Sequence, residues 1–438
     1  MSITLTLTPR KPALLVGFDN TLDVLVRMIG PAQPPEGSPA KTLNLSVVID
    51  QSGSMSGHPL EQAKRCAASI VDRLGPNDYI SIVTYGSEAS VVWSAGPVVD
   101  KLSIKRAIAG IETSGMTALH DGWLAGAEQA AKHVKAADVS RVLLLSDGCA
   151  NEGETDPKVL ADHCAKMAET GVGTSTYGLG VGFNETLMFA MAKAGGGNAY
   201  YGQTADDLMG AFQEEFDLLR ALCARQLVLT LDASSGVTAS VLNAAASPAG
   251  GWRLPDLAYG SESWALVRLT VPAARIPAEG AASAELLHAT VTCSAGDGSA
   301  VSVAGMLALP GLPSGSHSAL AEDETVARRS QEVEFAGLQQ QASDAAEVGD
   351  WVKVDHLLEK ARRAAADHDW LRASMAGLER LARRRDRSMF AKEARFKSSK
   401  MMSRLVSFEE RDEFSVSVER AAPSFLRRKL EEGRADQN

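Results

Sequence analysis

The sequence predicts an α/β fold with a doubly wound, Rossmann-like and mainly parallel sheet, accompanied by a β-sandwich and a C-terminal α-helical region. Between residues 43 and 222, continuous apolar runs alternate with amphipathic helical patterns, which indicates a parallel sheet covered on both faces. Between residues 226 and 310, apolar and polar residues alternate within short segments separated by Ala, Gly, Ser and Pro loops, a pattern typical of an antiparallel sandwich. After Pro310 the apolar residues return to helical spacing.

Length and composition indicate a multidomain globular protein. The 438 residues exceed one ordinary domain, and 45% of them are hydrophobic, which is enough for sizeable cores. The 44 Lys and Arg against 54 Asp and Glu give a net charge of −10. This acidic balance argues against a surface that binds nucleic acid globally, so we expect no specific nucleic-acid partner.

Cysteine usage and the N-terminus favour a reducing compartment. The five cysteines form no C-x-x-C pair and their number is odd, so they are expected to be individually placed thiols. Residues 1–7 alternate apolar and polar side chains instead of forming a signal-peptide core. No apolar run approaches the roughly 18 residues of a membrane span, so we expect a cytoplasmic protein without one.

The N-terminal region, residues 1–40, is expected to contribute two strands and a connector. Apolar residues alternate at 3–7 and again at 22–29, and residues 30–39 are rich in Pro and Gly. The sandwich region, residues 223–312, supplies only four or five strands, which is few for that fold. We therefore expect the N-terminal strands to complete the sandwich, with the α/β domain, residues 41–222, inserted between them.

Within the α/β domain the elements follow from periodicity and turn signals. Strands are predicted at 43–49, 79–85, 90–93, 142–145, 173–181 and 198–201. Helices are predicted at about 60–74, 104–111, 119–134, 157–170, 185–194 and 204–222.

The remaining segments are predicted in the same way. In the sandwich region, strands are expected at 227–231, 265–271, 287–293 and 301–309. The helical region, residues 318–405, carries apolar stripes that begin at Trp351 and Trp370 and predict an αα-hairpin. The tail, residues 406–438, is polar and is expected to be partly disordered.

The segment 379–405 is strongly basic, with ten Lys or Arg against three Asp or Glu. Such a segment can bind an acidic partner, nucleic acid or a membrane surface, or it can be a solvated helix face. The sequence leaves these alternatives open.

Oxygen-bearing side chains follow three of the predicted strands. Asp50 ends the first buried strand, and Ser52 and Ser54 follow at alternate positions. Thr117 lies in the loop before the helix at 119, and Asp147 ends the apolar run 142–145. Ligands of doubly wound sheets bind at the carboxyl ends of the strands, where these loops meet. Two carboxylates and three hydroxyls suit Mg²⁺, and the absence of His and Cys from these segments argues against zinc.

The pattern D-x-S-x-S, a distant Thr and a distant Asp resembles the metal-ion-dependent adhesion site (MIDAS) of the von Willebrand factor A (VWA) family. The segments 115–119, 145–148 and 177–184 are also similar to bacterial intracellular members. The resemblance covers about residues 41–222.

The resemblance implies how the site would work. The hydroxyls of Ser52, Ser54 and Thr117 would approach the metal, while Asp50 and Asp147 would hold coordinated waters or neighbouring hydroxyls. A partner's Asp or Glu would complete the coordination of Mg²⁺, with Mn²⁺ or Ca²⁺ as alternatives. This implies a metal-dependent protein-binding adaptor or scaffold, not an enzyme, and by resemblance the partner could belong to an AAA+ ATPase system.

Two other functions remain open at this point. A metal-dependent hydrolase or phosphatase would use Asp50 or Asp147 as nucleophile or base. It would need a second catalytic carboxylate or a Lys near these loops, and no such motif is found. A structural scaffold with a vacant site would bind neither Mg²⁺ nor Mn²⁺.

Overall fold

The computed structural model forms two compact units. It describes residues 3–38, 41–134, 139–147, 150–179, 184–202, 204–247, 250–296, 298–365, 368–402 and 406–407. One unit comprises residues 35–222 with the short stretch 296–299. The other comprises the described residues of 1–34, 223–295 and 300–421. Most of the predicted C-terminal tail, from residue 408 on, lies outside the described residues.

The α/β unit is built on a mainly parallel sheet, which confirms that part of the predicted fold class. Its described strands are, in the order in which they pair, β6 (Ala89–Pro97), β5 (Tyr79–Tyr85), β4 (Leu43–Asp50), β7 (Val139–Ser146), β8 (Val172–Leu179) and β9 (Gly196–Gly202). All of these neighbours pair in parallel except β5 and β6. Every residue of β4 and β7 is buried, as expected for central strands covered on both faces.

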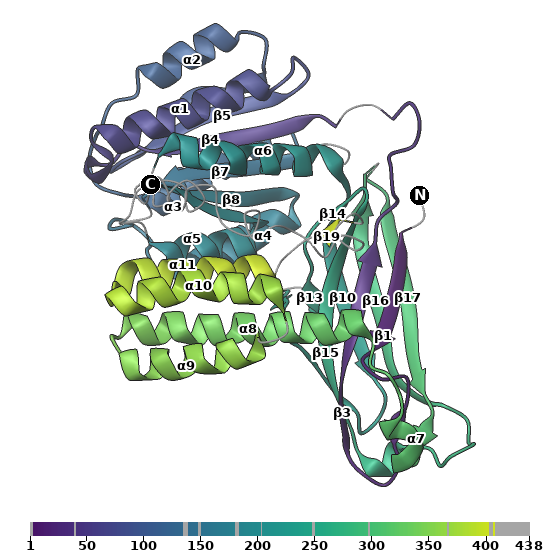
Figure 1. The fold of residues 1–438 in the computed structure, drawn as a ribbon. Helices are drawn as coiled ribbons and strands as arrows, with labels where there is room; N and C mark the ends of the chain where they lie inside the picture. The colour runs from purple at the N-terminus through teal and green to yellow at the C-terminus, as the bar shows by residue number, and fades with distance from the viewer. Residues whose placement is uncertain are drawn as a thin grey trace, which may run out of the picture. The chain divides into compact units, whose positions relative to one another are not determined.

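Helices lie on both faces of this sheet (Figure 1). They are α1 (His58–Arg73), α2 (Lys101–Ala109), α3 (Leu119–Ala131), α4 (Pro157–Glu169), α5 (Glu185–Ala194) and α6 (Ala205–Ala221). α1 packs against α2 and α6, and α4 packs against α5. No helix among the described residues is both long enough and apolar enough to span a membrane.

Helix α3 approaches the sheet closely because two of its glycines face the strands. A Cβ atom on Gly122 would lie 2.3 Å from Cδ1 of Tyr85, and one on Gly126 would lie 2.3 Å from Cγ2 of Val48. Real Cβ atoms do not approach other atoms so closely, so these positions require glycine. The start of α3 is thereby held against the ends of β4 and β5.

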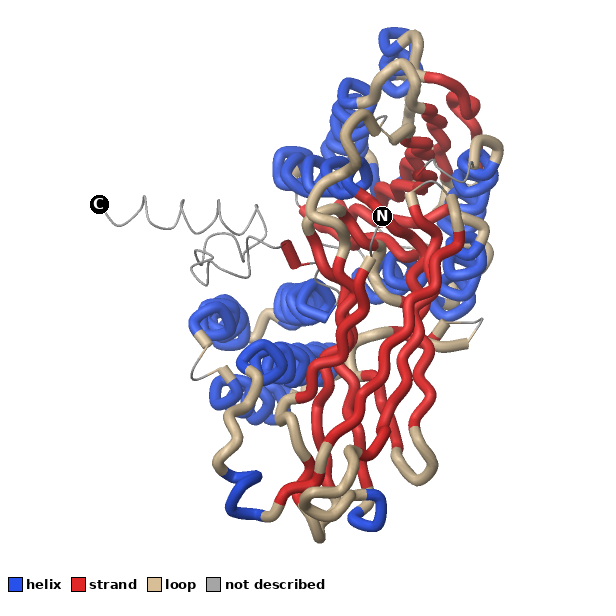
Figure 2. The backbone as a smooth tube through the Cα atoms, turned by 90° about the vertical axis from the view of Figure 1, so that its right-hand side faces the viewer, coloured by secondary structure: helices blue, strands red, loops and turns tan. Residues whose placement is uncertain are grey.

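The second unit contains two antiparallel sheets whose long strands run alongside one another (Figure 2). In the described residues, the first sheet contains β1 (Thr4–Pro9), β3 (Asn20–Ile29), β15 (Ser261–Val271) and β11 (Thr238–Val241), with β19 (Val406–Ser407) on β15. The second contains β12 (Ala245–Ala246), β13 (Trp252–Arg253), β10 (Leu222–Ala233), β16 (Ala284–Ala295) and β17 (Ala300–Leu309), with β14 (Leu257–Ala258) on β10. A short parallel pair joins β2 (Leu14–Leu15) to β18 (Gly311–Leu312).

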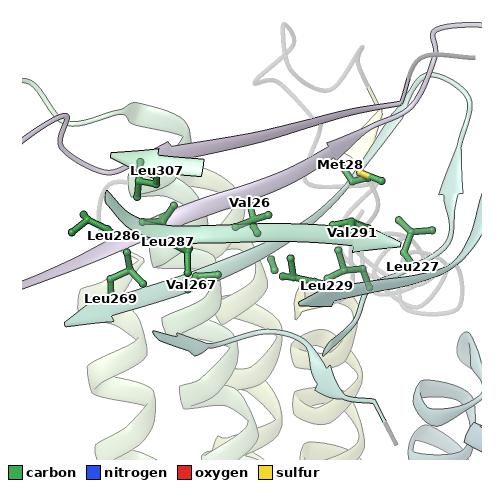
Figure 3. Packing of buried hydrophobic residues seen from close by; sticks show 14 of the residues in the cluster. Val26, Met28, Leu227, Leu229, Val267, Leu269, Leu286, Leu287, Val291 and Leu307 are labelled. Atoms are coloured by element: carbon green, nitrogen blue, oxygen red, sulfur yellow. The ribbon is translucent and has the colours of Figure 1, made fainter. Parts of the chain in front are cut away.

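The core of this unit lies between the two sheets (Figure 3). Val26 of β3 and Val267 of β15 pack there with Leu229 of β10 and Val291 of β16. β3 pairs with β15 along its whole length, from Ile29 opposite Glu262 to Asn20 opposite Val271. An N-terminal strand therefore shares a sheet with a strand that follows the α/β unit in sequence.

The helical region contains more than the predicted αα-hairpin. After the short α7 (Ser314–Ser318), its described helices are α8 (Glu324–Glu347), α9 (Trp351–Ala364), α10 (Asp369–Arg384) and α11 (Arg387–Met402). α8 packs against both α9 and α11, so the two-helix prediction was incomplete. The buried residues of α8 include many small or polar side chains, such as Ala336, Gln339 and Ser343, and this gives little apolar periodicity.

The basic segment is divided between buried and exposed positions. Lys392 and Arg395 of α11 are buried, so this part of the segment is not a solvated face. Arg383 and Arg384, at the end of α10, are exposed.

Candidate metal site

The first candidate loop begins where β4 ends. Asp50 is buried, and its Oδ1 accepts a 2.9 Å hydrogen bond from the backbone N–H of Ser52. The chain then forms a 3₁₀ turn over Gly53–Met55, in which the Met55 side chain is buried. Gly57, with a φ of +77°, directs the chain into α1. The loop is therefore fixed at both ends.

The other oxygen of Asp50 is held by neighbouring strands. Ser146, at the end of β7, donates a 2.7 Å hydrogen bond to Oδ2 of Asp50. The hydroxyl of Tyr85, at the end of β5, lies 2.8 Å from Ser146 Oγ and 3.1 Å from the same Oδ2. Three adjacent strands thus end in one buried polar cluster.

Burial makes the negative charge of Asp50 unfavourable. Desolvation raises the pKa of Asp50 from its ordinary value, and the hydrogen bonds from Ser52 and Ser146 oppose that increase. The negative charge of Asp147 raises the pKa of Asp50 further, and burial likewise raises that of Tyr85 well above its usual value. A cation near these carboxylates would favour their ionised forms, so the electrostatics suit cation binding.

Ser52 and Ser54 place two hydroxyls beside Asp50. Their Oγ atoms are 3.1 Å apart, with Ser52 buried and Ser54 exposed. The pair therefore connects the buried carboxylate to the solvent-facing side of the loop.

The second loop, which carries Thr117, lies directly against the first. The N–H of Ser114 donates to the carbonyl of Gln51 at 2.7 Å, and the N–H of Gly53 donates to the carbonyl of Gly115 at 3.2 Å. Gly115 has a φ of +74°, a conformation that favours glycine. Thr117, two residues further on, is buried.

The third loop is joined to the second through Thr117. The N–H of Thr117 donates to Oδ1 of Asn151 at 2.9 Å, and the N–H groups of Asn151 and Glu152 donate to the carbonyl of Thr117. Asp147 is half-buried, and its carbonyl accepts from the N–H of Asn184. Backbone contacts therefore connect all three predicted loops.

The structure brings the predicted residues together to different degrees. Asp50, Ser52 and Ser54 form one contact group, Thr117 is tied to it through the loop backbones, and Asp147 is close enough to affect the pKa of Asp50. Among the described residues, no three His, Cys, Asp or Glu side chains cluster as metal ligands.

The sequence did not assign the supporting roles of Tyr85, Ser146 and Asn151. Ser146 directly precedes Asp147, and its position after an apolar strand could have marked it as a loop-edge hydroxyl. For Tyr85 and Asn151 no local signal predicts the contact, because each depends on how distant segments pair.

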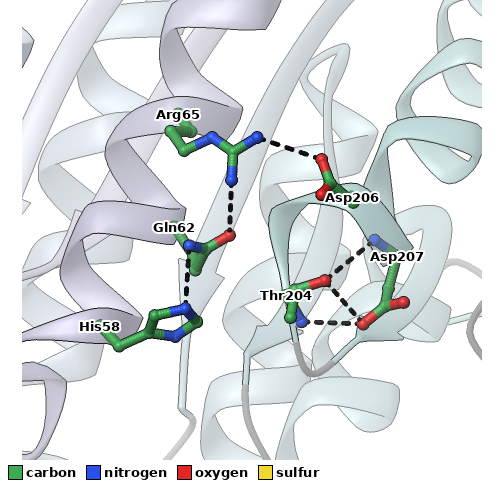
Figure 4. A network of polar contacts seen from close by, with 6 residues as sticks. All are labelled: His58, Gln62, Arg65, Thr204, Asp206 and Asp207. Carbon is green, nitrogen blue, oxygen red and sulfur yellow. Dashed lines mark hydrogen bonds and ion pairs between the residues drawn. The ribbon is translucent and has the colours of Figure 1, made fainter.

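A polar chain anchors the helix that follows the first loop (Figure 4). At the start of α1, the amide nitrogen of Gln62 lies 3.2 Å from Nε2 of His58. Arg65 donates to Oε1 of Gln62 at 3.4 Å and to Asp206, at the start of α6, at 3.1 Å. The N-terminal half of α1 is therefore linked to the first turn of α6.

The family model of the von Willebrand factor type A domain matches residues 44–215. These residues form a VWA domain. The match contains all three candidate loops, so all five candidate ligands lie inside the domain.

Two solved structures share the fold over most of the chain. A von Willebrand factor type A protein from Catenulispora acidiphila has a TM-score of 0.67 and 16% identity, covering 85% of this chain and 89% of its own. The ArnB paralog VWA2 from Sulfolobus acidocaldarius has a TM-score of 0.60 and 18% identity, covering 92% and 98%. At these identities the similarity concerns the fold alone.

Curated relatives match over a shorter stretch. An uncharacterized protein of Synechocystis sp. is 31% identical over 178 residues, which are 40% of this chain and 41% of the relative. The uncharacterized protein YfbK of Escherichia coli is 31% identical over 190 residues, covering 43% and 32%. Human inter-alpha-trypsin inhibitor heavy chain H3 is 29% identical over 193 residues, covering 41% and 22%. The chain thus spans less than half the length of these relatives.

Proposed function

We propose that this protein is a divalent-metal-dependent adaptor that binds another protein through a MIDAS in its VWA domain. The ion would be held by Asp50, Ser52, Ser54, Thr117 and Asp147. The observation that carries this proposal is that the hydroxyls of Ser52 and Ser54, hydrogen-bonded to each other at 3.1 Å, lie beside a buried carboxylate.

The donor set is suited to magnesium. Hydroxyl and carboxylate oxygens are the ligands that Mg²⁺ prefers in proteins. We therefore propose Mg²⁺ as the cofactor, with Mn²⁺ or Ca²⁺ as alternatives because they take similar oxygen ligands.

The donor set explains why a partner would bind. The hydroxyls of Ser52, Ser54 and Thr117 are neutral, and Asp50 is already hydrogen-bonded through both of its oxygens. With neutral hydroxyls as its direct protein ligands and the two carboxylates acting through waters or hydroxyls, a bound ion would still attract a further anionic ligand. An Asp or Glu side chain of a protein partner would gain strongly from completing the site.

The same contacts count against a catalytic role. Both oxygens of Asp50 accept hydrogen bonds and the residue is buried, so its carboxylate is poorly placed to attack a substrate that arrives from solvent. A hydrolase or phosphatase that uses Asp50 or Asp147 is therefore the weaker alternative. Phosphatase activity that exceeds that of an Asp50→Ala variant would support it instead.

The remaining parts of the proposal come from resemblance. They are a bacterial intracellular type of VWA protein, a cytoplasmic location and a partner drawn from an AAA+ ATPase system. The domain division that accompanies them places the VWA domain at 41–222, between sandwich segments at 1–40 and 223–312.

Metal titration of the full chain tests the proposal. We expect Mg²⁺ to give a calorimetric binding signal and to raise the Tm of the native chain, and we expect Ser54→Ala to abolish both effects. Ser56→Ala is the matched control, because Ser56 is an exposed serine of the same loop that lies outside the candidate set. Absence of Mg²⁺ and Mn²⁺ binding, or equal loss in Ser56→Ala, would refute the metal site.

A second measurement tests the partner. A protein captured by the native chain should be released by EDTA and should not bind Asp50→Ala. Retention that is unaffected by both changes would show that binding does not pass through the metal.

A further inference from the structure

Two loops meet at one end of the helical region. The α8–α9 and α10–α11 connections lie at the same end of these helices (Figure 1). Arg385, between α10 and α11, forms a 2.9 Å ion pair with Asp355 of α9, and its guanidinium lies 5.0 Å from the centre of the Trp351 ring. Arg385 therefore ties the α10–α11 connection to the start of α9.

Four arginines are exposed on this surface without a bound carboxylate. We name them the arginine face; they are Arg380, Arg383, Arg384 and Arg387. Within the described part of the chain, no Asp or Glu forms an ion pair with any of them. Acids close to them in the fold have other partners: Glu379 pairs with Arg362, Asp355 pairs with Arg385, and Asp386 accepts a hydrogen bond from the N–H of Met389.

Stabilisation of helices α10 and α11 does not explain the presence of all four arginines. Positive charges near the end of α10 interact favourably with the helix dipole, which explains Arg383 and Arg384 in part. Arg387 begins α11, where a positive charge is unfavourable for the same reason. Arginines three or four residues apart also repel one another, as Arg380 does with the pair in the next turn. The cluster is therefore electrostatically costly in the isolated protein.

Two exposed aliphatic side chains lie at the same end of the helical region as the arginine face. Val348 is 76% exposed and Val352 is 83% exposed, at the end of α8 and the start of α9. Val352 is one helical turn from Asp355, which binds Arg385. A charged cluster and two exposed apolar residues thus occupy the same end of the helical region.

We propose that this end is a docking surface for an acidic amphipathic segment of a protein partner, distinct from the metal site. Carboxylates of the segment would bind the arginine face, since guanidinium groups match carboxylates in a bidentate geometry. Aliphatic residues of the segment would cover Val348 and Val352. Arginine is enriched at protein interfaces, and the buried centre of an interface is more apolar than the rest of the surface.

A protein partner fits these features better than nucleic acid does. The net charge of −10 repels a long polyanion, whereas a short acidic segment contacts only the arginine face. The Trp351 ring is already covered by Arg385, so it is not free to stack with a base. The valine side chains also cannot donate a hydrogen bond to, or form an ion pair with, a phosphate backbone.

Peptide binding to the full chain tests this proposal. The probes are a fluorescent helical peptide of Glu and Leu on opposite faces, a Glu-only peptide of equal charge, and a single-stranded oligonucleotide. All titrations contain EDTA, so a result here is independent of the metal-dependent function proposed above. We expect the Glu–Leu peptide to bind most tightly and its affinity to fall with added salt, because ion pairs at a surface are screened.

Substitutions identify the surface. R383Q/R384Q should weaken binding of the Glu–Leu peptide by about tenfold, as expected for loss of two interface arginines. R362Q/R363Q is the matched control: it removes the same charge from exposed arginines that are already paired with Glu359 and Glu379, and it should change affinity by less than about twofold. V352S should weaken the Glu–Leu peptide but not the Glu-only peptide.

The following outcomes would overturn the proposal. Failure of the Glu–Leu peptide to bind, or equal losses in R383Q/R384Q and R362Q/R363Q, would show that the arginine face is solvated. Tighter binding of the oligonucleotide with the same dependence on Arg383 and Arg384 would assign the surface to nucleic acid. Self-association of the chain that R383Q/R384Q abolishes would assign it to a second copy.

Discussion

The hydroxyl of Ser146 donates a 2.7 Å hydrogen bond to the carboxylate of Asp50, and this bond joins the ends of β7 and β4. Both residues are buried, and the hydroxyl of Tyr85 on β5 forms hydrogen bonds with both of them. The relationship means that the first and third candidate loops are positioned by one polar cluster. The stability of the sheet edge and the properties of the candidate metal site should therefore change together.

Ser146→Ala should lower the free energy of unfolding by about 1–3 kcal/mol, because it leaves Asp50 and Tyr85 buried with one partner fewer. Urea denaturation measures the change. Ser56→Ala serves as the control and should have little effect, because Ser56 is exposed. Equal stability of the two variants would mean that the cluster contributes nothing at this position.

Asp50→Asn should change how stability depends on pH. The folded-state pKa of Asp50 is raised, so the folded protein holds this proton more tightly than the unfolded chain does. The resulting stabilisation is fully present below the unfolded pKa, near 3.8, and is lost as pH rises through the folded pKa. In EDTA, the native chain should therefore lose stability relative to Asp50→Asn as pH rises above this value.

Denaturation of both proteins between acidic and neutral pH checks this expectation. Added Mg²⁺ should stabilise the native chain at neutral pH but not Asp50→Asn, because the variant lacks the carboxylate charge. Parallel pH profiles in EDTA would contradict the raised pKa.

Gly122→Ala should destabilise the VWA domain although alanine favours helix. Its Cβ would lie 2.3 Å from the Tyr85 ring, and overpacking of this kind costs about 1–3 kcal/mol. Gly337→Ala in α8 is the matched control, because no atom lies within 4 Å of its new Cβ. That variant should gain about 0.5–1 kcal/mol from helix propensity. Thermal unfolding should separate the two in opposite directions, and a stabilised Gly122→Ala would show that α3 can move off the sheet.

Arg329→Met should destabilise the packing of α8 on the first sheet of the sandwich. The Arg329 guanidinium pairs with Glu332 at 2.6 Å and with Glu262 at 3.7 Å, and it lies over the Trp264 ring. Removal of one member of a buried ionic group costs about 3–5 kcal/mol, since the remaining charges are left buried.

Urea unfolding followed by tryptophan fluorescence measures that loss. The control is Arg362→Met, which breaks an exposed pair with Glu379 and should cost less than about 1 kcal/mol. Similar losses in both variants would contradict a buried network.

The sequence predicted the VWA domain well because its strands are marked locally. The run 142–145 is continuously apolar, and the observed β7 is buried throughout. Helix α8 lies within the predicted helical region but was not delimited as a separate helix, for the opposite reason. Its buried face mixes apolar residues with Gln339, Ser343 and even the charged Arg329, so its apolar periodicity is weak.

The candidate ligands were predicted by type and order, and their assignment as a metal site stays a prediction. Asp50, Ser52 and Ser54 are neighbours in sequence, so their proximity is a local property of one loop. The approach of Thr117 depends on hydrogen bonds from the second loop to Gln51 and Gly53, which no local pattern specifies.

By itself, the sequence determined the periodicities, the turn glycines and the three oxygen-bearing loops, because each depends on residues a few positions apart. Only the tertiary structure decided which strands pair and which side chains meet. It placed β3 beside β15, Tyr85 and Ser146 on Asp50, and Arg385 on Asp355. These contacts join residues distant in sequence, and they form because each element buries its apolar face against another.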